Sequence, residues 1–248
     1  MKNPFRLVTL FSLLFSLSAC GPRETWDYVT LGDSLQAAST ISEEYAKYIE
    51  KDQRVEIVFH QYAERGTPPS YMLMKLQLNP EIRAAIADAE VITFNFSPGW
   101  SNNPDDKYLK DECGGTDNQE CLREAVVKAK SDWTAIAGEI TALKGGDPVL
   151  IRMFSVGDWP YDGYYNDTMT AEQKAVLLKY YFEVREYVEQ DALARGIQVV
   201  RIFPEPYYDN ELPPVDYFQS DGLHLSEKGS QIVGEMLRDL GYEFVVLK

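Results

Sequence analysis

Residues 26–35 have the sequence WDYVTLGDSL. Most of residues 26–31 are apolar, aromatic or β-branched, which is typical of a β-strand covered on both faces. Gly32 then permits a tight turn, because it has no Cβ atom. We therefore expect Ser34 to lie at a junction between a strand and a helix.

The rest of the chain repeats this alternation. Further apolar runs predict strands over residues 55–59, 91–96, 149–154 and 197–203. Helices are predicted over residues 41–51, 81–87, 120–143, 171–195 and 227–240. Capping-box patterns, Thr40 with Glu43 and Thr170 with Gln173, precede two of these helices. Strands that alternate with helices predict an α/β fold with a parallel sheet and right-handed crossovers, in one domain over residues 26–248.

The composition excludes several classes of protein. The chain has 248 residues, of which 45% are hydrophobic, and this is too high a share for a disordered protein. Its formal charge is −15, whereas a nucleic-acid partner requires a basic surface. The same charge argues against a peripheral protein held by anionic lipid head groups.

The first residues predict export. Lys2 and Arg6 precede an apolar run over residues 7–18, which is too short to span a bilayer and fits a signal peptide over residues 1–19. The run ends in LSAC, which resembles the bacterial lipobox with Cys20 as the lipidated residue. We expect an exported lipoprotein that faces the periplasm or the cell exterior and contacts the membrane through this anchor only. The alternative is an ordinary cleaved signal with an incidental cysteine.

The two other cysteines predict a disulfide. Cys113 and Cys121 flank a turn-rich segment in what we expect to be an oxidising compartment. Closing so short a loop should stabilise the fold by roughly 2–3 kcal/mol. A metal site is the alternative, but no histidine or further cysteine lies nearby in the sequence.

A serine and a histidine at opposite ends of the domain suggest chemistry. Ser34 is either a helix cap or a nucleophile, and a serine nucleophile needs a base. The chain has two histidines. His60 ends the second predicted strand, which indicates a structural role. His224 follows Asp221 by three residues, so the Asp221 carboxylate can fix the imidazole tautomer and leave Nε2 to accept the serine proton.

Together these motifs resemble the SGNH/GDSL hydrolase family. The first motif of that family is matched by TLGDSL at residues 30–35, and its last by DGLHLS at residues 221–226, with Gly229 following. The resemblance extends over about residues 26–241, and the segment CGGTDNQECL at residues 113–122 is similar to an insertion in exported bacterial members.

The resemblance carries expectations about fold and chemistry. It implies a three-layer α/β/α, flavodoxin-like fold with a five-stranded parallel sheet and the hydrolysis of esters. It implies that Ser34 is the nucleophile, His224 the base and Asp221 the residue that orients it. It requires no metal and no organic cofactor, and we expect a monomer that acts on a small-molecule ester, either a lipid or an acylated glycan.

The sequence offers clear counterparts for only two of the three oxyanion donors that the resemblance implies. Gly66 is similar to the glycine that follows the second strand in the family, and the backbone N–H of Ser34 is another donor. The family's Gly-x-Asn-Asp motif after the third strand is replaced by FSPGWSNN at residues 96–103, with Gly99 at the asparagine position. Asn102 is the substitute we consider, and Asn95 is a weaker one because it belongs to the strand. Loss of one oxyanion donor typically costs about 10²–10³ in turnover.

These observations favour a serine esterase or lipase-like hydrolase. A carbohydrate O-deacetylase is the first alternative, because aromatic residues crowd the predicted loops 157–168 and 204–217. The second is a lipoprotein that keeps this scaffold but binds glycan or lipid without efficient catalysis. An acidic cluster is predicted to be a solvated loop rather than a calcium site. It consists of Asp105, Asp106, Asp111 and Glu112.

Overall fold

The computed structural model describes residues 23–96, 103–156, 169–202, 215–221 and 224–248. The predicted signal peptide, Cys20, Gly99 and Asn102 lie outside the described residues, as does most of the two aromatic loops. None of the helices in the described ranges has a stretch long and apolar enough to cross a bilayer.

A parallel sheet of five strands forms the centre of the molecule, with the order β2-β1-β3-β4-β5. The strands are β1 (Thr25–Leu31), β2 (Glu56–Gln61), β3 (Val91–Asn95), β4 (Leu150–Val156) and β5 (Gln198–Ile202). This is the flavodoxin-like order, in which the chain reverses direction across the sheet between β1 and β3. Ligands of such sheets bind beyond the carboxyl ends of the strands at this point.

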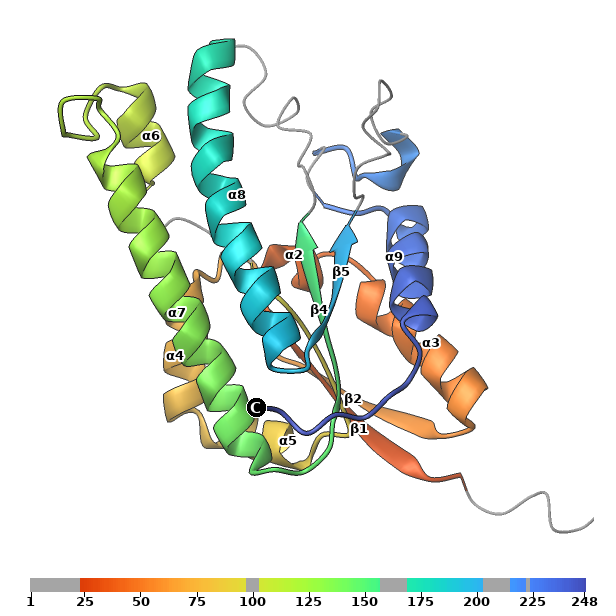
Figure 1. Cartoon of the computed structure of the whole chain (residues 1–248). Helices are drawn as coiled ribbons and strands as arrows, with labels where there is room; N and C mark the ends of the chain where they lie inside the picture. Colours follow the sequence, from red (N-terminus) through yellow and green to blue (C-terminus); the bar gives the residue numbers. More distant parts are fainter. Residues whose placement is uncertain (1–22, 97–102, 157–168, 203–214, 222–223) are drawn as a thin grey trace, which may run out of the picture.

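Helices cover both faces of the sheet (Figure 1). One face packs against α3 (Ile41–Gln53) and α9 (Glu227–Asp239). The other face packs against four helices. These are α4 (Pro69–Leu78), α5 (Pro80–Asp88), α7 (Glu120–Lys144) and α8 (Ala171–Ala194). Successive side chains of β1 enter the two cores in turn, Tyr28 on one face and Val29 on the other, so the predicted three-layer α/β/α class is confirmed.

The predicted strands and helices all appear with small shifts at their ends, and Ser34 begins a helix shortly after β1 as expected, the short α2 (Ser34–Ala37). Two helices were not predicted, the short α6 (Pro104–Leu109) and the longer α4. The apolar residues Tyr71, Met74 and Leu78 of α4 are exposed, so the helix lacks the clear division into apolar and polar faces that predicts a surface helix.

Two local expectations were wrong. The Thr40 side chain makes no capping hydrogen bond, whereas the capping box of Thr170 and Gln173 is confirmed. The acidic cluster is not a single solvated loop, because Asp105 and Asp106 belong to α6 and Asp105 is buried.

The predicted disulfide is confirmed. Cys113 and Cys121 are joined, with their Cα atoms 4.9 Å apart. Asn118 braces the loop that they close, because its Oδ1 accepts from the Cys113 N–H at 2.8 Å and its Nδ2 donates to the Tyr108 carbonyl at 2.8 Å. The disulfide therefore links the segment after α6 to the first turn of α7.

Candidate active site

Ser34 is the first residue of α2, directly after the turn that ends β1. Gly32 makes this turn with a φ of 135°, which side-chain-bearing residues rarely adopt. Asp33 caps the helix, because its Oδ1 accepts from the Leu35 N–H at 2.8 Å. Ser34 is left partly exposed at the carboxyl edge of the sheet, beside the point between β1 and β3 where the strand order reverses.

Asn95 holds this turn from the neighbouring strand. It is the last residue of β3; its Nδ2 donates to Asp33 Oδ1 at 2.8 Å, and its Oδ1 accepts from the Asp33 N–H at 3.2 Å. A Cβ atom at Gly32 would lie 2.0 Å from Asn95 Oδ1, so only glycine fits there. The Asn95 amide therefore bonds the serine turn through both its oxygen and its nitrogen.

A buried network of polar side chains holds α2 against the strands and α3. Gln36 donates from Nε2 to Ser42 Oγ at 2.5 Å and to Thr93 Oγ1 at 3.0 Å. Tyr28 shares a hydrogen bond of 2.9 Å with Thr93 Oγ1, and burial raises the pKa of its phenol. Because the phenol stays neutral, the network holds α2 to β1, β3 and α3 without burying a charge.

His224 and Asp221 form the pair expected from the sequence. His224 Nδ1–H donates to Asp221 Oδ2 at 2.7 Å, and the His224 backbone N–H donates to Asp221 Oδ1 at 3.0 Å. In the neutral ring this bond leaves Nε2 as the acceptor. His224 Nε2 is buried and, within the part of the chain that the structure describes, has no hydrogen-bond partner.

The histidine segment packs against the corner that carries Ser34. The Thr40 backbone N–H, just after α2, donates to Ser230 Oγ in α9 at 3.2 Å. A Cβ atom at Gly229 would lie 2.2 Å from the Tyr217 carbonyl oxygen, so the start of α9 is pressed onto the segment before His224. This segment and the start of α9 lie at the same end of the sheet as the carboxyl ends of β4 and β5 (Figure 1).

Gly66 lies in the loop between β2 and α4, with a φ of 72° and an exposed position. This loop is tied to the serine turn, because the Glu64 N–H donates to the Gly32 carbonyl at 3.1 Å. Lys75 supports it from α4, with its Nζ 2.7 Å from Glu64 Oε1 and 3.4 Å from the Tyr62 carbonyl oxygen. The predicted oxyanion glycine and the predicted nucleophile thus follow neighbouring strands and share one corner of the sheet.

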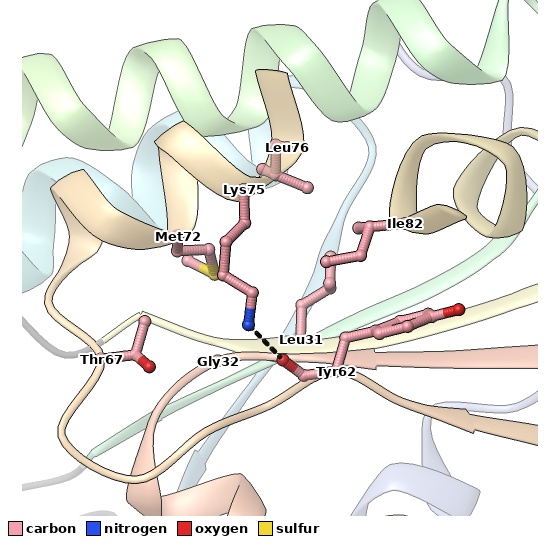
Figure 2. Close-up of a pocket in the computed structure, with 8 residues that line it drawn as sticks. All are labelled: Leu31, Gly32, Tyr62, Thr67, Met72, Lys75, Leu76 and Ile82. Carbon is pink, nitrogen blue, oxygen red and sulfur yellow. Dashed lines mark hydrogen bonds between the residues drawn. The ribbon is translucent and has the colours of Figure 1, made fainter. Parts of the chain in front are cut away.

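A small pocket separates this loop from α4 and the start of α5 (Figure 2). Its volume of about 10 Å³ is room for a single water molecule. Lys75 points across it toward the Tyr62 carbonyl. It is lined by Leu31, Gly32, Tyr62, Thr67, Met72, Lys75, Leu76 and Ile82. Its walls are mostly apolar, so it is a packing feature beside Gly32 and too small to hold an ester.

The other histidine lies elsewhere. His60 belongs to the edge strand β2, and its Nε2 is 2.8 Å from Asp27 Oδ1 on β1. This pairing agrees with the structural role expected for His60. Within the described ranges, no three histidine, cysteine or acidic side chains gather closely enough to hold a metal ion.

No protein-family model and no curated protein matches the sequence. Solved structures do match the fold. The lipase Lip_vut3 from a goat rumen metagenome superposes with a TM-score of 0.64 at 19% identity, over 88% of this chain and 98% of its own.

Two further structures match with lower TM-scores. BT4096, described as a gut microbial diltiazem-metabolizing enzyme, gives 0.59 at 13% identity, over 88% of this chain and 47% of its own. A variant of the acetyl xylan esterase Axe2 from Geobacillus stearothermophilus gives a TM-score of 0.52 at 11% identity, over 90% of this chain and 98% of its own. The likeness at these identities concerns the fold, and it agrees with the SGNH hydrolase architecture expected from the sequence.

Proposed function

We propose that this protein is a serine esterase that cleaves carboxylic esters through an acyl-enzyme on Ser34. One observation carries the proposal. His224 has its Nδ1 fixed by Asp221, while its Nε2 is buried and unpaired, among the described residues, in the corner that holds the serine helix. An unpaired buried acceptor costs about 1–3 kcal/mol, so its retention is expected where the atom has a chemical task.

The proposed reaction has two balanced steps. Ser34 Oγ attacks the ester carbonyl carbon as its proton passes to His224 Nε2, and the carboxylate of Asp221 stabilises the imidazolium. The imidazolium then returns this proton to the leaving alcohol as the C–O bond breaks. Water repeats the sequence on the acyl-enzyme, and release of the carboxylic acid restores the Ser34 hydroxyl.

The developing oxyanion requires donors at the same corner. The first N–H groups of a helix have no partner within the helix, so the Ser34 N–H at the start of α2 is a suitable donor. Gly66 is proposed as the second donor, since its loop is bonded to the serine turn. We propose Asn102 as the third, which rests on the sequence alone.

The solved structures that share this fold support ester hydrolysis. Among the solved structures with the same fold are a lipase and an acetyl xylan esterase. Because one of them is an acetyl xylan esterase, a carbohydrate O-deacetylase remains the alternative activity. The binding lipoprotein is the alternative without catalysis, and the experiments below separate the three.

The first experiment measures hydrolysis of p-nitrophenyl acetate. Ser34→Ala and His224→Ala are each expected to lower kcat/KM by at least about 10³-fold. Ser131→Ala on the exposed face of α7 and His60→Ala are matched controls, which should leave turnover within a factor of about two. Undiminished turnover by Ser34→Ala would remove this mechanism.

The second experiment uses a fluorophosphonate, which labels an activated serine covalently. Labelling of Ser34 whose rate falls strongly in His224→Ala supports the esterase. No labelling, together with tight retention of a glycan or lipid, would identify a binding protein instead. Release of acetate from acetylated xylan faster than from p-nitrophenyl acetate would favour the deacetylase.

A further inference from the structure

Gln219 is bonded to the histidine segment along the backbone. Its N–H donates to the His224 carbonyl at 2.7 Å, and the Ser226 N–H donates to the Tyr217 carbonyl at 2.9 Å. Phe218 and Leu225 form an antiparallel bridge between these two bonds. The segments on either side of the Asp221 turn therefore form a short ladder, and the backbone of His224 is fixed relative to that of Gln219.

The side chain of Gln219 reaches out of this ladder to the serine helix. Its Nε2 donates to the Ala38 carbonyl at 2.8 Å and to the Leu225 carbonyl at 2.9 Å. Ala38 is the C-cap of α2, and its own N–H donates to the Ser34 carbonyl at 2.8 Å. One amide group thus bonds the residue after His224 and the end of the single helical turn that begins at Ser34.

This bridge differs in kind from the bond between Asp221 and His224. Asp221 lies three residues before His224 in the same loop, so its carboxylate orients the ring within that loop. The Gln219 amide instead crosses from the loop to another element. One of its N–H groups bonds the Ala38 carbonyl on that element, and the other bonds the Leu225 carbonyl within the histidine segment.

We propose that Gln219 is a positioning residue that sets the separation between His224 Nε2 and Ser34 Oγ by holding the histidine segment against the end of α2. The inference rests on the proposed function, because it assigns a purpose to that separation. Proton transfer from a serine to an imidazole requires a distance of about 2.6–3.2 Å in the reacting complex. A misplacement of about 1 Å can lower the rate about 10²-fold.

The test begins with Gln219→Met, which keeps the length and approximate volume of the side chain and removes both donors. We expect kcat for p-nitrophenyl acetate to fall about 10- to 100-fold while KM stays within about threefold, since the ester still binds but meets a displaced base. Gln219→Asn keeps the amide but is one methylene shorter, so it should also lose the bridge. Gln198→Met, on the exposed edge of β5, is the matched control and should change neither constant.

A double-mutant cycle distinguishes positioning from general support of the fold. Gln219→Met, or Gln219→Asn if the first variant does not fold, is combined with His224→Ala, and the rate of Ser34 labelling by a fluorophosphonate is measured per folded molecule. Positioning predicts a roughly 10- to 100-fold effect when His224 is present and less than about a twofold effect when it is absent. A general structural role predicts the same factor in both backgrounds.

The outcomes also separate this inference from the function on which it rests. Full labelling of His224→Ala would overturn the proposed function. A strong effect of His224→Ala with no effect of the Gln219 variants, or with an equal effect in both backgrounds, would overturn the role of Gln219 and leave the esterase intact.

Discussion

The two histidines of this chain make the same contact in different places. His224 bonds Asp221 at 2.7 Å, and His60 bonds Asp27 at 2.8 Å. The pair of His60 joins two strands at one edge of the sheet, whereas the pair of His224 lies in the corner that carries the serine helix.

The difference lies in which nitrogen remains. Asp221 bonds Nδ1 of His224. The other nitrogen, Nε2 at the tip of the ring, is buried and unpaired within the described residues. Asp27 takes Nε2 of His60 and leaves Nδ1, the atom nearer to its own backbone. A His–Asp pair is therefore not sufficient for a candidate base. The outer nitrogen must be left over, and a nucleophile must be near it.

Replacing each aspartate by asparagine should give the largest difference between the two His–Asp pairs. Asp221→Asn should lower kcat/KM about 10³–10⁴-fold, because an amide that donates to His224 Nδ1 enforces the wrong tautomer. Such a loss corresponds to about 4–5 kcal/mol of transition-state stabilisation. Asp27→Asn makes the same chemical change at the other pair, and its kcat/KM should stay within about twofold. Equal losses in the two variants, measured with p-nitrophenyl acetate, would mean that the pairs are equivalent.

The serine turn should be the next most sensitive point. Gly32→Ala requires a side chain at a φ of 135° and within 2.0 Å of Asn95 Oδ1, so we expect a loss of about 4 kcal/mol in the free energy of unfolding. Gly146→Ala is the control, because Gly146 has a φ of 96° and a Cβ atom added to it would meet no other atom within 4 Å. It should lose only about 1 kcal/mol.

Urea unfolding measures both glycine variants. If they lose equal stability, positive φ alone accounts for the need for glycine at residue 32. The close approach of Asn95 would then play no part in holding Ser34.

Most of the fold was predictable, because the buried strands are short apolar runs and several helix ends carry strong cap signals. Asn79 before Pro80 is such a signal at the start of α5, where its side chain accepts from the N–H groups of Glu81 and Ile82. The expected cap at Thr40 did not form, because its backbone (φ −103°, ψ 23°) lies outside the extended region that an N-cap residue adopts. Its backbone N–H is bonded instead to Ser230 Oγ, a partner 190 residues away that no local pattern reveals.

The candidate site was predictable where motifs are local. Asp221 and His224 are three residues apart, so their contact follows from one turn. The roles of Asn95 and Gln219 were not predictable, because each depends on a contact between distant segments, with Asp33 and Ala38 respectively. An amide at the end of a buried strand beside the switch point was the one available signal for Asn95.

A third aspartate, Asp105, extends the comparison, because it is buried and neither His60 nor His224 is its partner. Asp105 is buried on α6, its Oδ1 has no partner within the described ranges, and burial raises its pKa from 3.8 to about 7. The protonated carboxyl therefore favours the folded state. Its contribution is present below about pH 4 and is lost as the pH rises through about 7.

We accordingly expect the free energy of unfolding of Asp105→Asn to be close to that of the parent near about pH 4 and to exceed it by about 4 kcal/mol at about pH 8. Urea unfolding at both values measures the difference. The exposed neighbour Asp106→Asn should show a much smaller pH-dependent gain, because the Asp106 charge is only the lesser cause of the raised Asp105 pKa. A gain for Asp105→Asn that is the same at both pH values would contradict the assignment to a buried, uncompensated carboxyl.

The disulfide offers the smallest effect and a control for the whole comparison, because it lies between α6 and α7 and bonds neither His–Asp pair. Replacing Cys113 and Cys121 together by serine should lower the free energy of unfolding by about 2.5 kcal/mol, the chain-entropy value for so short a loop. Dithiothreitol should have the same effect on the parent and none on the double variant. Since the serine turn, the Gln219 bridge and His224 are all untouched, kcat/KM at room temperature should stay within about twofold. A large loss of turnover in a variant that remains folded would mean that the α6–α7 segment supports the site directly, and that the contrast between the two histidines is not confined to their immediate surroundings.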